Sequence, residues 1–224
     1  MKKISVIIPT LNEASCIALC LDSLALMRRR GHEVIVVDAG STDATVSLSK
    51  TNTDSVLTTS KGRARQLNHG AEKASGEMLV FLHADTLLPE NADEILNSLM
   101  TEDEVWGRFD VRLSGTKFIF RIIEFLMNQR SRLSAIATGD QAIFVSRQLF
   151  NRVGGFPEID LMEDINICAN LKKIKRPVCL KQKVRCSSRR WEKNGITKTI
   201  LKMWMLRLRF ALGEKPERLA REYE

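Results

Sequence analysis

The chain has 224 residues, of which 44% are hydrophobic and 28% charged, and its formal net charge is +8. This composition is typical of a globular protein and excludes a disordered chain. The length suits one large domain with an extension. The positive charge favours anionic partners, such as a nucleotide, a phospholipid or a phosphorylated acceptor. Aromatic residues make up only 6% and do not alternate with the basic residues, so no nucleic-acid partner is expected.

Cysteine content and apolar runs predict the compartment. The five cysteines are an odd, scattered set, which favours free thiols in a reducing compartment. The N-terminal apolar run is too short for a signal peptide, and charges interrupt the short apolar stretches at residues 118–127 and 200–212. We therefore expect a cytoplasmic protein without a membrane span.

Strands and helices alternate through the first half of the chain. Four apolar runs predict strands, at residues 5–8, 34–37, 55–58 and 78–82. Helical spacing and capping signals predict four helices, at residues 13–30, from a cap at Ser41 or Thr42 to residue 50, at residues 63–74 and at residues 89–100. This alternation predicts an α/β fold with a mostly parallel sheet and helices on both faces.

The second half is less regular. Three strands are predicted there, at residues 105–112, 142–145 and 178–184. Three helices are predicted as well, at residues 119–133, 165–171 and 197–212. No repeat or low-complexity linker divides the chain, so we expect a single domain.

Polar residues follow three of the predicted parallel strands, at residues 9–13, 38–43 and 83–85. In an open parallel sheet, ligands bind beyond the carboxyl ends of the strands, where these segments should meet. The first segment reads PTLNE, without the glycines of a dinucleotide-binding turn, and no phosphate-binding P-loop occurs elsewhere. A nucleotide would have to be held by side chains and a metal ion.

The same segments carry a family resemblance. VIIPTLNE at residues 6–13, VVDAGSTD at 36–43, FLHAD at 81–85, TGDQ at 138–141 and the Glu163-Asp164 pair resemble the inverting family 2 glycosyltransferases of the GT-A fold. The resemblance covers residues 4–191, and residues 62–86 further resemble a small bacterial subgroup whose substrate is poorly defined. It implies a Rossmann-like GT-A domain at residues 1–192 and a basic, amphipathic helical extension at residues 193–224.

The implied reaction transfers a sugar from a UDP- or GDP-sugar to a hydroxyl acceptor with inversion. The nucleotide-sugar site would comprise Pro9, Thr10, Asn12, Glu13, Asp38, Arg63, Arg190 and Trp191. Asp38 would accept a hydrogen bond from the base, and Arg63 and Arg65 would reach the phosphates. Arg190 and Trp191 are included because they partly match the Gln-x-x-Arg-Trp signature of polysaccharide synthases. The alternatives are a helix N-terminal acid for Glu13, a simple turn at Asp38 and solvent-facing arginines.

Asp85 is the expected metal ligand. The family pattern is Asp-x-Asp at the end of the fourth strand, and this chain has His83-Ala84-Asp85, a variant that departs at the first position. Mn²⁺ or Mg²⁺ is typically held by one or two carboxylates together with the substrate phosphates. The resemblance gives the last aspartate this role, and the alternative for Asp85 is a helix cap.

Asp164 is the expected general base, with Glu163 beside it. An inverting transfer needs a carboxylate that takes the proton of the acceptor hydroxyl. Burial and like charge in the sequence LMEDI could raise one of the two pKa values. The alternative is an ordinary helix N-terminus with acids in its first turn.

The C-terminal helix allows two interpretations. We expect it first to pack against the domain or a second subunit, and alternatively to lie on an anionic inner-membrane surface. Two other functions compete with sugar transfer: a nucleotidyltransferase, which normally has a glycine-rich loop after the first strand, and a non-catalytic module that binds nucleotide-sugars or a membrane surface.

Overall fold

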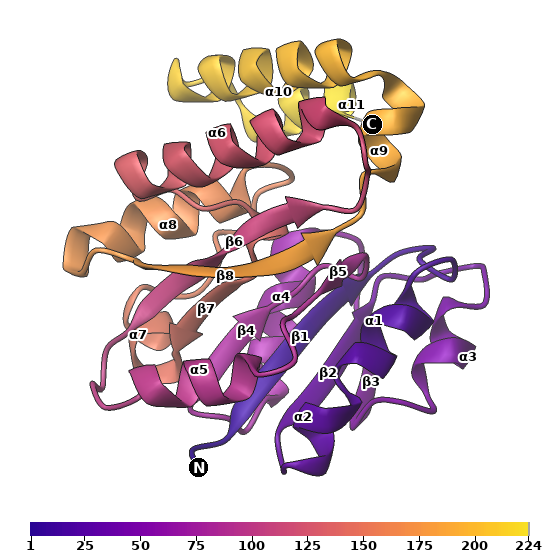
Figure 1. Ribbon diagram of the computed structural model, residues 1–224, viewed down its shortest axis with the longest axis vertical. Helices are drawn as coiled ribbons and strands as arrows, with labels where there is room; N and C mark the ends of the chain where they lie inside the picture. The colour runs from indigo at the N-terminus through magenta and orange to yellow at the C-terminus, as the bar shows by residue number, and fades with distance from the viewer. Residues whose placement is uncertain (224) are drawn as a thin grey trace.

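The computed structural model describes residues 1–223, except for the side chains of Arg190 and Asn194. The fold centres on one eight-stranded sheet with the order β3-β2-β1-β4-β7-β6-β8-β5 (Figure 1). Its strands are β1 (Ile4–Thr10), β2 (Glu33–Asp38), β3 (Ser55–Thr58), β4 (Met78–Phe81), β5 (Thr86–Leu87), β6 (Trp106–Leu113), β7 (Ile143–Ser146) and β8 (Val178–Cys186).

The sheet is mostly parallel, as predicted. β3, β2, β1 and β4 are parallel neighbours, and Val6 of β1 lies opposite Val34 of β2 and Val80 of β4. β7 runs antiparallel between β4 and β6, and the short β5 is antiparallel to β8 at the edge. β1, β2 and β4 are almost wholly buried, because helices cover both of their faces.

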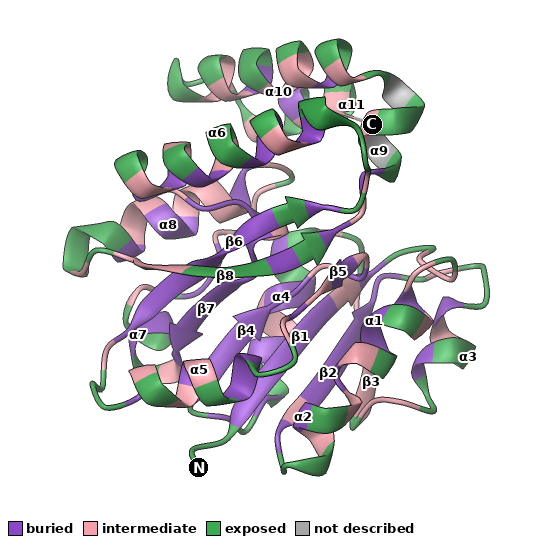
Figure 2. Cartoon of the chain, in the orientation of Figure 1, coloured by how far each residue is buried: buried purple, intermediate pink, exposed green. Residues whose placement is uncertain are grey.

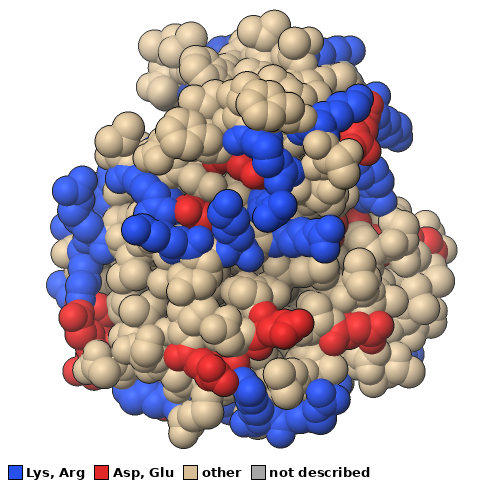
Figure 3. Space-filling model, in the orientation of Figure 1, with Lys and Arg blue, Asp and Glu red and all other residues tan. Residues whose placement is uncertain are grey.

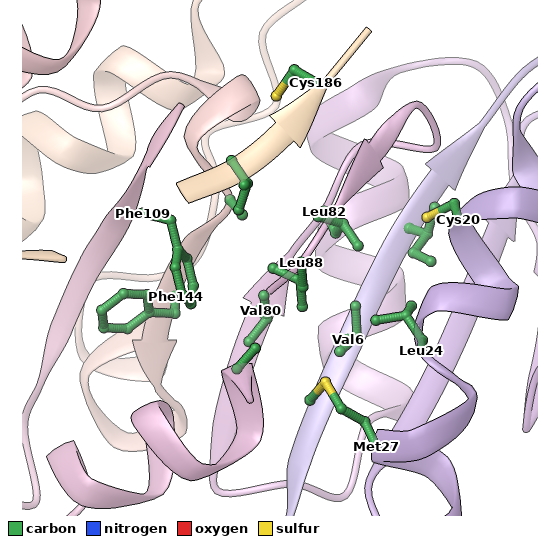
Figure 4. Packing of buried hydrophobic residues seen from close by; sticks show 14 of the residues in the cluster. Val6, Cys20, Leu24, Met27, Val80, Leu82, Leu88, Phe109, Phe144 and Cys186 are labelled. Carbon is green, nitrogen blue, oxygen red and sulfur yellow. The ribbon is translucent and has the colours of Figure 1, made fainter. Parts of the chain in front are cut away.

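Helices cover the two faces of the sheet. The first face carries α1 (Ile17–Ser23), α2 (Ala25–Arg29), α5 (Ala92–Leu99) and α6 (Phe118–Ser134). The second face carries α4 (Arg63–Lys73), α7 (Arg147–Arg152) and α8 (Glu163–Ile174). On the first face, Leu24 and Met27 lie against Val6 (Figure 4), and the strands form the buried centre of the molecule (Figure 2). The chain is therefore a single α/β domain, as expected.

Two predicted helices begin or end elsewhere. The segment 13–30 is divided at Leu24 into α1 and α2, and the Ser23 hydroxyl donates to the Cys20 carbonyl at the end of α1. The next helix, α3 (Thr45–Ser49), is not capped by Ser41 or Thr42. Asp43 accepts a hydrogen bond from the Thr45 amide instead, because the Ser41 hydroxyl is bonded to Asp38.

Three helices follow the sheet: α9 (Arg189–Asn194), α10 (Ile196–Ala211) and α11 (Pro216–Tyr223). Leu206 of α10 and Leu219 of α11 are buried together with Met162, which directly precedes α8. The helices lie at one end of the molecule (Figure 1). Within residues 1–223, no helix has both the length and the hydropathy that a membrane span requires.

Candidate active site

The loops after β1 and β2 are joined through Asp38. This buried carboxylate accepts hydrogen bonds from the Thr10 hydroxyl, 3.0 Å away, from the Ser41 hydroxyl, and from the amides of Gly40 and Ser41. A carboxylate has about four lone-pair sites, and four donors already use them. Asp38 therefore shapes this loop, and a nucleotide base would have to replace one of the present donors.

Gln66 of α4 also connects the two strand ends. Its buried amide nitrogen donates to the Thr10 carbonyl at 2.9 Å and to the Val37 carbonyl at 2.8 Å. On the sequence alone it looked like any polar residue of an amphipathic helix. It holds the polar segments after β1 and β2 at a fixed separation.

Replacing Gln66 by alanine is expected to lower the free energy of unfolding by about 1–3 kcal/mol, because two buried hydrogen bonds are lost. Urea denaturation of the variant and the wild type measures this difference. Gln182→Ala is the matched control, since Gln182 is exposed on β8. An equal loss in both variants would contradict the role given to Gln66.

Asn12 and Glu13 complete the first loop. Asn12 has a left-handed backbone with φ 56°, and its side-chain oxygen accepts a hydrogen bond from the Thr42 amide. Glu13 Oε2 lies 3.7 Å from Arg189 Nη2 of α9 and accepts a hydrogen bond from the Cys16 thiol. Arg189, which the sequence analysis did not select, therefore brings a cation to the nucleotide-side loop.

Asp85 lies on the same edge of the sheet. Its carbonyl accepts a hydrogen bond from the Ser187 amide after β8, and its side chain is half-buried. Burial, then the Glu13 carboxylate and then the Asp85 carboxylate raise the pKa of Cys16 to about 12. Asp85 and Glu13 are thus close enough to act on the same thiol.

The metal-ligand set around Asp85 is small. No group of three or more His, Cys, Asp or Glu side chains that could hold a metal ion occurs in the described part of the chain. Mn²⁺ and Mg²⁺ often take only one or two carboxylates and complete their coordination with substrate phosphates and water. A single carboxylate at this edge of the sheet fits an ion that is held partly by substrate phosphates, and it does not fit a closed structural metal site.

Gly139 links His83 to Asp164. It lies in the short helix η1 (Gly139–Gln141), and a Cβ there would be 2.2 Å from His83 Nε2, so only glycine fits against this ring. Its amide donates to Asp164 Oδ2 at 3.0 Å. The neighbouring Asp140 Oδ1 lies 3.3 Å from His83 Nδ1. The His-Ala-Asp segment is therefore linked through Gly139 to the predicted base.

Glu163 and Asp164 form the first turn of α8. Burial, and then the adjacent Asp164 carboxylate, raise the pKa of Glu163, although Arg63 acts in the opposite direction. Arg63 Nη1 lies 4.0 Å from Glu163 Oε1, on an arginine side chain that is 47% exposed. The two acids share one site with unequal surroundings, because Glu163 is buried and Asp164 is half-buried.

The backbone before these acids is strained. Met162 has φ 70° and ψ 21°, a left-handed conformation that costs a residue with a side chain about 1–2 kcal/mol. Its side chain is buried under Leu206 and Leu219 of the C-terminal helices. Packing of the extension thus fixes the position at which α8 begins.

A small pocket contains the two acids. Apolar and charged side chains share its lining: Arg63, Leu67, Phe81, His83, Gly139, Ile143, Phe156, Glu163 and Asp164. A larger cavity of about 310 Å³ lies near Lys2, Glu77 and Met100, at the opposite edge of the sheet. We assign the site to the small pocket, because ligands of parallel sheets bind beyond the carboxyl ends of the strands.

The remaining predicted residues are less well placed. Trp191 is partly buried and packs against the apolar core of the first sheet face. Arg65 Nη2 lies 3.4 Å from Glu158 and its side chain is exposed. The side chain of Arg190 lies outside the part of the chain that the structure describes. Pro9 is the half-buried penultimate residue of β1.

Comparison with known proteins defines the family. The family model described as Glycosyl transferase family 2 matches residues 5–156, more than half of the chain. The chain belongs to glycosyl transferase family 2. A PGL/p-HBAD biosynthesis glycosyltransferase of Mycobacterium bovis is 31% identical over 169 residues, which cover 68% of this chain and 62% of the relative. This family 2 chain thus spans less than two thirds of that protein.

Solved structures agree with the fold of this family 2 member. TarS of S. aureus matches with a TM-score of 0.66 and 20% identity, over 83% of this chain and 60% of TarS. The mannosyltransferase PcManGT of Pyrobaculum calidifontis, in complex with GDP-Man and Mn²⁺, matches with a TM-score of 0.61 and 26% identity, over 82% of this chain and 56% of PcManGT. The chain therefore has an α/β fold of the GT-A type.

Proposed function

We propose that the enzyme transfers a sugar from a nucleotide diphosphate sugar to a hydroxyl acceptor with inversion. The observation that supports this most is the continuous connection from the His83–Asp85 segment through Gly139 to Asp164. It brings a candidate metal ligand and a candidate base to one edge of the sheet. In the transfer, the acceptor oxygen forms a bond to the sugar C1 and the bond from C1 to the diphosphate oxygen breaks on the opposite side.

Asp164 is proposed to take the acceptor proton. Its carboxylate is positioned by the Gly139 amide and by its own neighbour, the Ile165 amide, so that it has little freedom to turn away. Burial, and then the adjacent Asp164 carboxylate, raise the pKa of Glu163, the more buried acid of the pair. Asp164 is proposed as the base because it is the more exposed of the two acids, with Glu163 and Arg63 shaping its surroundings.

Asp85 is proposed to hold a divalent cation, Mn²⁺ or Mg²⁺, that reaches the site with the donor. Such an ion neutralises the charge that develops on the departing diphosphate. PcManGT carries Mn²⁺ with GDP-Man, which supports a metal in a related site. Arg63 and Arg189 are the described cations that can assist at the phosphates, from α4 and α9.

The nucleotide is proposed to lie across the loops after β1 and β2, against Pro9, Thr10, Asn12, Glu13 and Asp38. PcManGT binds GDP-Man and TarS binds UDP-GlcNAc. Either a UDP- or a GDP-sugar therefore suits the present chain. Arg190 and Trp191 are proposed to bind the diphosphate or to border the acceptor groove, and Trp191 also packs on the core.

We further propose the division of the chain and its location. Residues 1–192 would form the transferase domain, and residues 193–224 an extension that supports α8 through Leu206 and Leu219. All five cysteines are free thiols, which supports a reducing, cytoplasmic compartment. The C-terminal helix is proposed first to pack against the domain, as Leu206 does, and alternatively to contact an inner-membrane surface with its outer side.

A donor panel tests the proposed function. The protein is incubated with UDP- and GDP-sugars and Mn²⁺, with and without crude cell extract as a source of acceptor, and release of nucleoside diphosphate is followed. We expect release that depends on the extract and stops with EDTA. Pyrophosphate released from a nucleoside triphosphate would identify a nucleotidyltransferase, and donor binding without turnover would identify a binding module.

A further inference from the structure

Helix α6 presents its apolar face to solvent. Six exposed large apolar side chains follow one another at helical spacing: Phe118, Ile119, Ile122, Phe125, Leu126 and Leu133. Phe118 is 77% exposed and Leu133 80%. The opposite face packs on the sheet with Phe120 and Ile123, but it also buries the polar Glu124, Asn128 and Ser131. On an ordinary surface helix, polar side chains face the solvent and apolar side chains face the core.

Helix α10 has the same unusual arrangement. The exposed side chains of α10 and its C-cap are Leu201, Trp204, Met205, Leu208 and Leu212. They recur at intervals of three and four residues, which places them on one side of the helix. Trp204 is 71% exposed, whereas Leu206 on the inner side is wholly buried. The outer side of α10 therefore consists largely of unpartnered apolar surface.

The two helices belong to one surface. They occupy the same end of the molecule, where exposed residues predominate (Figures 1 and 2). Burial, and then the positive charge of Arg207 on α10, lower the pKa of Arg130 on α6 to about 10, so the helices are electrostatic neighbours. We call these eleven side chains the apolar face. Apolar patches of more than a few hundred Å² normally mark an interaction site on a soluble protein.

The charge on and beside the two helices is mainly positive, and Glu214 and Glu222, which lie near α10, are paired with Arg209. Glu124 is the one acid in α6 and is buried, where it accepts a hydrogen bond from the Leu113 amide, and α10 contains no acid. Exposed basic residues lie at the start of α6, in α10 and on β8: Lys117, Lys198, Lys181, Lys183 and Arg185. A space-filling view shows mostly tan surface at this end, with a band of Lys and Arg and a few acids below it (Figure 3).

We propose that the apolar face inserts into the headgroup region of an anionic phospholipid bilayer, with the basic residues on the lipid phosphates. Apolar side chains flanked by Lys and Arg are what a helix lying in a membrane interface requires. A symmetric dimer is a poorer occupant, because a two-fold contact would bring the same face, and its cations, against itself. The binding needs neither nucleotide nor acceptor, so it can be tested apart from sugar transfer.

Trp204 allows a direct measurement. Of the three tryptophans, Trp106 is wholly buried and Trp191 is partly buried against the core, so Trp204 should dominate any change on binding. With vesicles of phosphatidylcholine containing one third phosphatidylglycerol, we expect a blue shift of fluorescence and quenching by brominated acyl chains. Trp204→Phe should lose the shift and still sediment with the vesicles.

Variants that introduce a negative charge into the apolar face complete the test in vesicle sedimentation. Trp204→Glu and Phe125→Glu are each expected to weaken binding about tenfold or more, because an apolar contact is replaced by a carboxylate. Leu19→Glu is the control, since Leu19 is 63% exposed on α1, far from the apolar face in sequence and fold. Pure phosphatidylcholine vesicles, or high salt, should reduce the binding of the wild type.

Three results would overturn the proposal. The first is no association with the anionic vesicles, and the second is an equal loss in Leu19→Glu. The third is a dimer in light scattering that Trp204→Glu dissociates, which would assign the apolar face to a second copy of this chain. Circular dichroism of each variant confirms that the exposed substitutions leave the fold intact.

Discussion

Replacing Asp164 by asparagine is expected to lower the rate of sugar transfer about 10²–10⁴-fold, the usual contribution of a general base. Asparagine keeps an oxygen that can accept the Gly139 hydrogen bond, so the loop from His83 to α8 should remain in place. The affinity for the nucleotide sugar should stay close to that of the wild type. Steady-state transfer rates and calorimetric donor binding measure the two effects separately.

The control for this change is Asp160→Asn, because Asp160 is an exposed acid in the loop just before α8. It should transfer sugar at the rate of the wild type. If Asp164→Asn instead loses donor binding while its circular dichroism is unchanged, Asp164 belongs to the donor site and another group takes the acceptor proton.

Removing the Asp85 carboxylate is expected to have the second large effect. Asp85→Ala should weaken donor binding in the presence of Mn²⁺ about tenfold or more, which corresponds to about 1.4 kcal/mol. The Asp85 carbonyl, which accepts the Ser187 hydrogen bond, is kept in the variant. Titration of donor with Mn²⁺ and with EDTA isolates the part of the affinity that depends on the metal.

Asp103→Ala is the matched control, since Asp103 is an exposed acid near the cavity at the opposite edge of the sheet. It should bind donor like the wild type under both conditions. Unchanged Mn²⁺-dependent affinity in Asp85→Ala would remove this residue from the metal site and leave the cation to other ligands.

The central strands could be predicted from sequence because both of their faces are covered. β1, β2 and β4 each contain a short run of buried apolar residues, and this run already defines the strand. The two-residue β5 has no such run, and its pairing with β8 arises only in the assembled sheet. The local sequence pattern therefore could not predict β5.

Helix ends were predicted less well because several polar residues compete for the same donors. Ser41 and Thr42 were both reasonable caps. However, the Ser41 hydroxyl donates a hydrogen bond to Asp38, and Asp43 accepts the hydrogen bond of the Thr45 amide. Likewise, the apolar spacing of residues 13–30 is continuous across Leu24, and nothing in it reveals the break between α1 and α2.

The candidate site shows the same division. Thr10, Asp38, Asp85 and His83 could be selected because a parallel sheet brings its strand ends to one edge. Gln66 and Gly139 lie in segments that carry the family resemblance, but their contacts could not be predicted, because these depend on distant partners, the Val37 carbonyl and the His83 ring. The spacing of α10 predicted an amphipathic helix, but it did not show which side faces the core.

The two sides of α10 have a consequence for how the enzyme would respond to lipid. Leu206 points inward to Met162, the strained residue on which the first turn of α8 depends, while Trp204 points outward. Contact with a bilayer would restrain the outer side of α10 and therefore also its inner side. The carboxylates in the first turn of α8 would then be held more rigidly. Turnover would then rise with lipid even for a water-soluble acceptor, and deletion of the extension would abolish both the response and the basal rate.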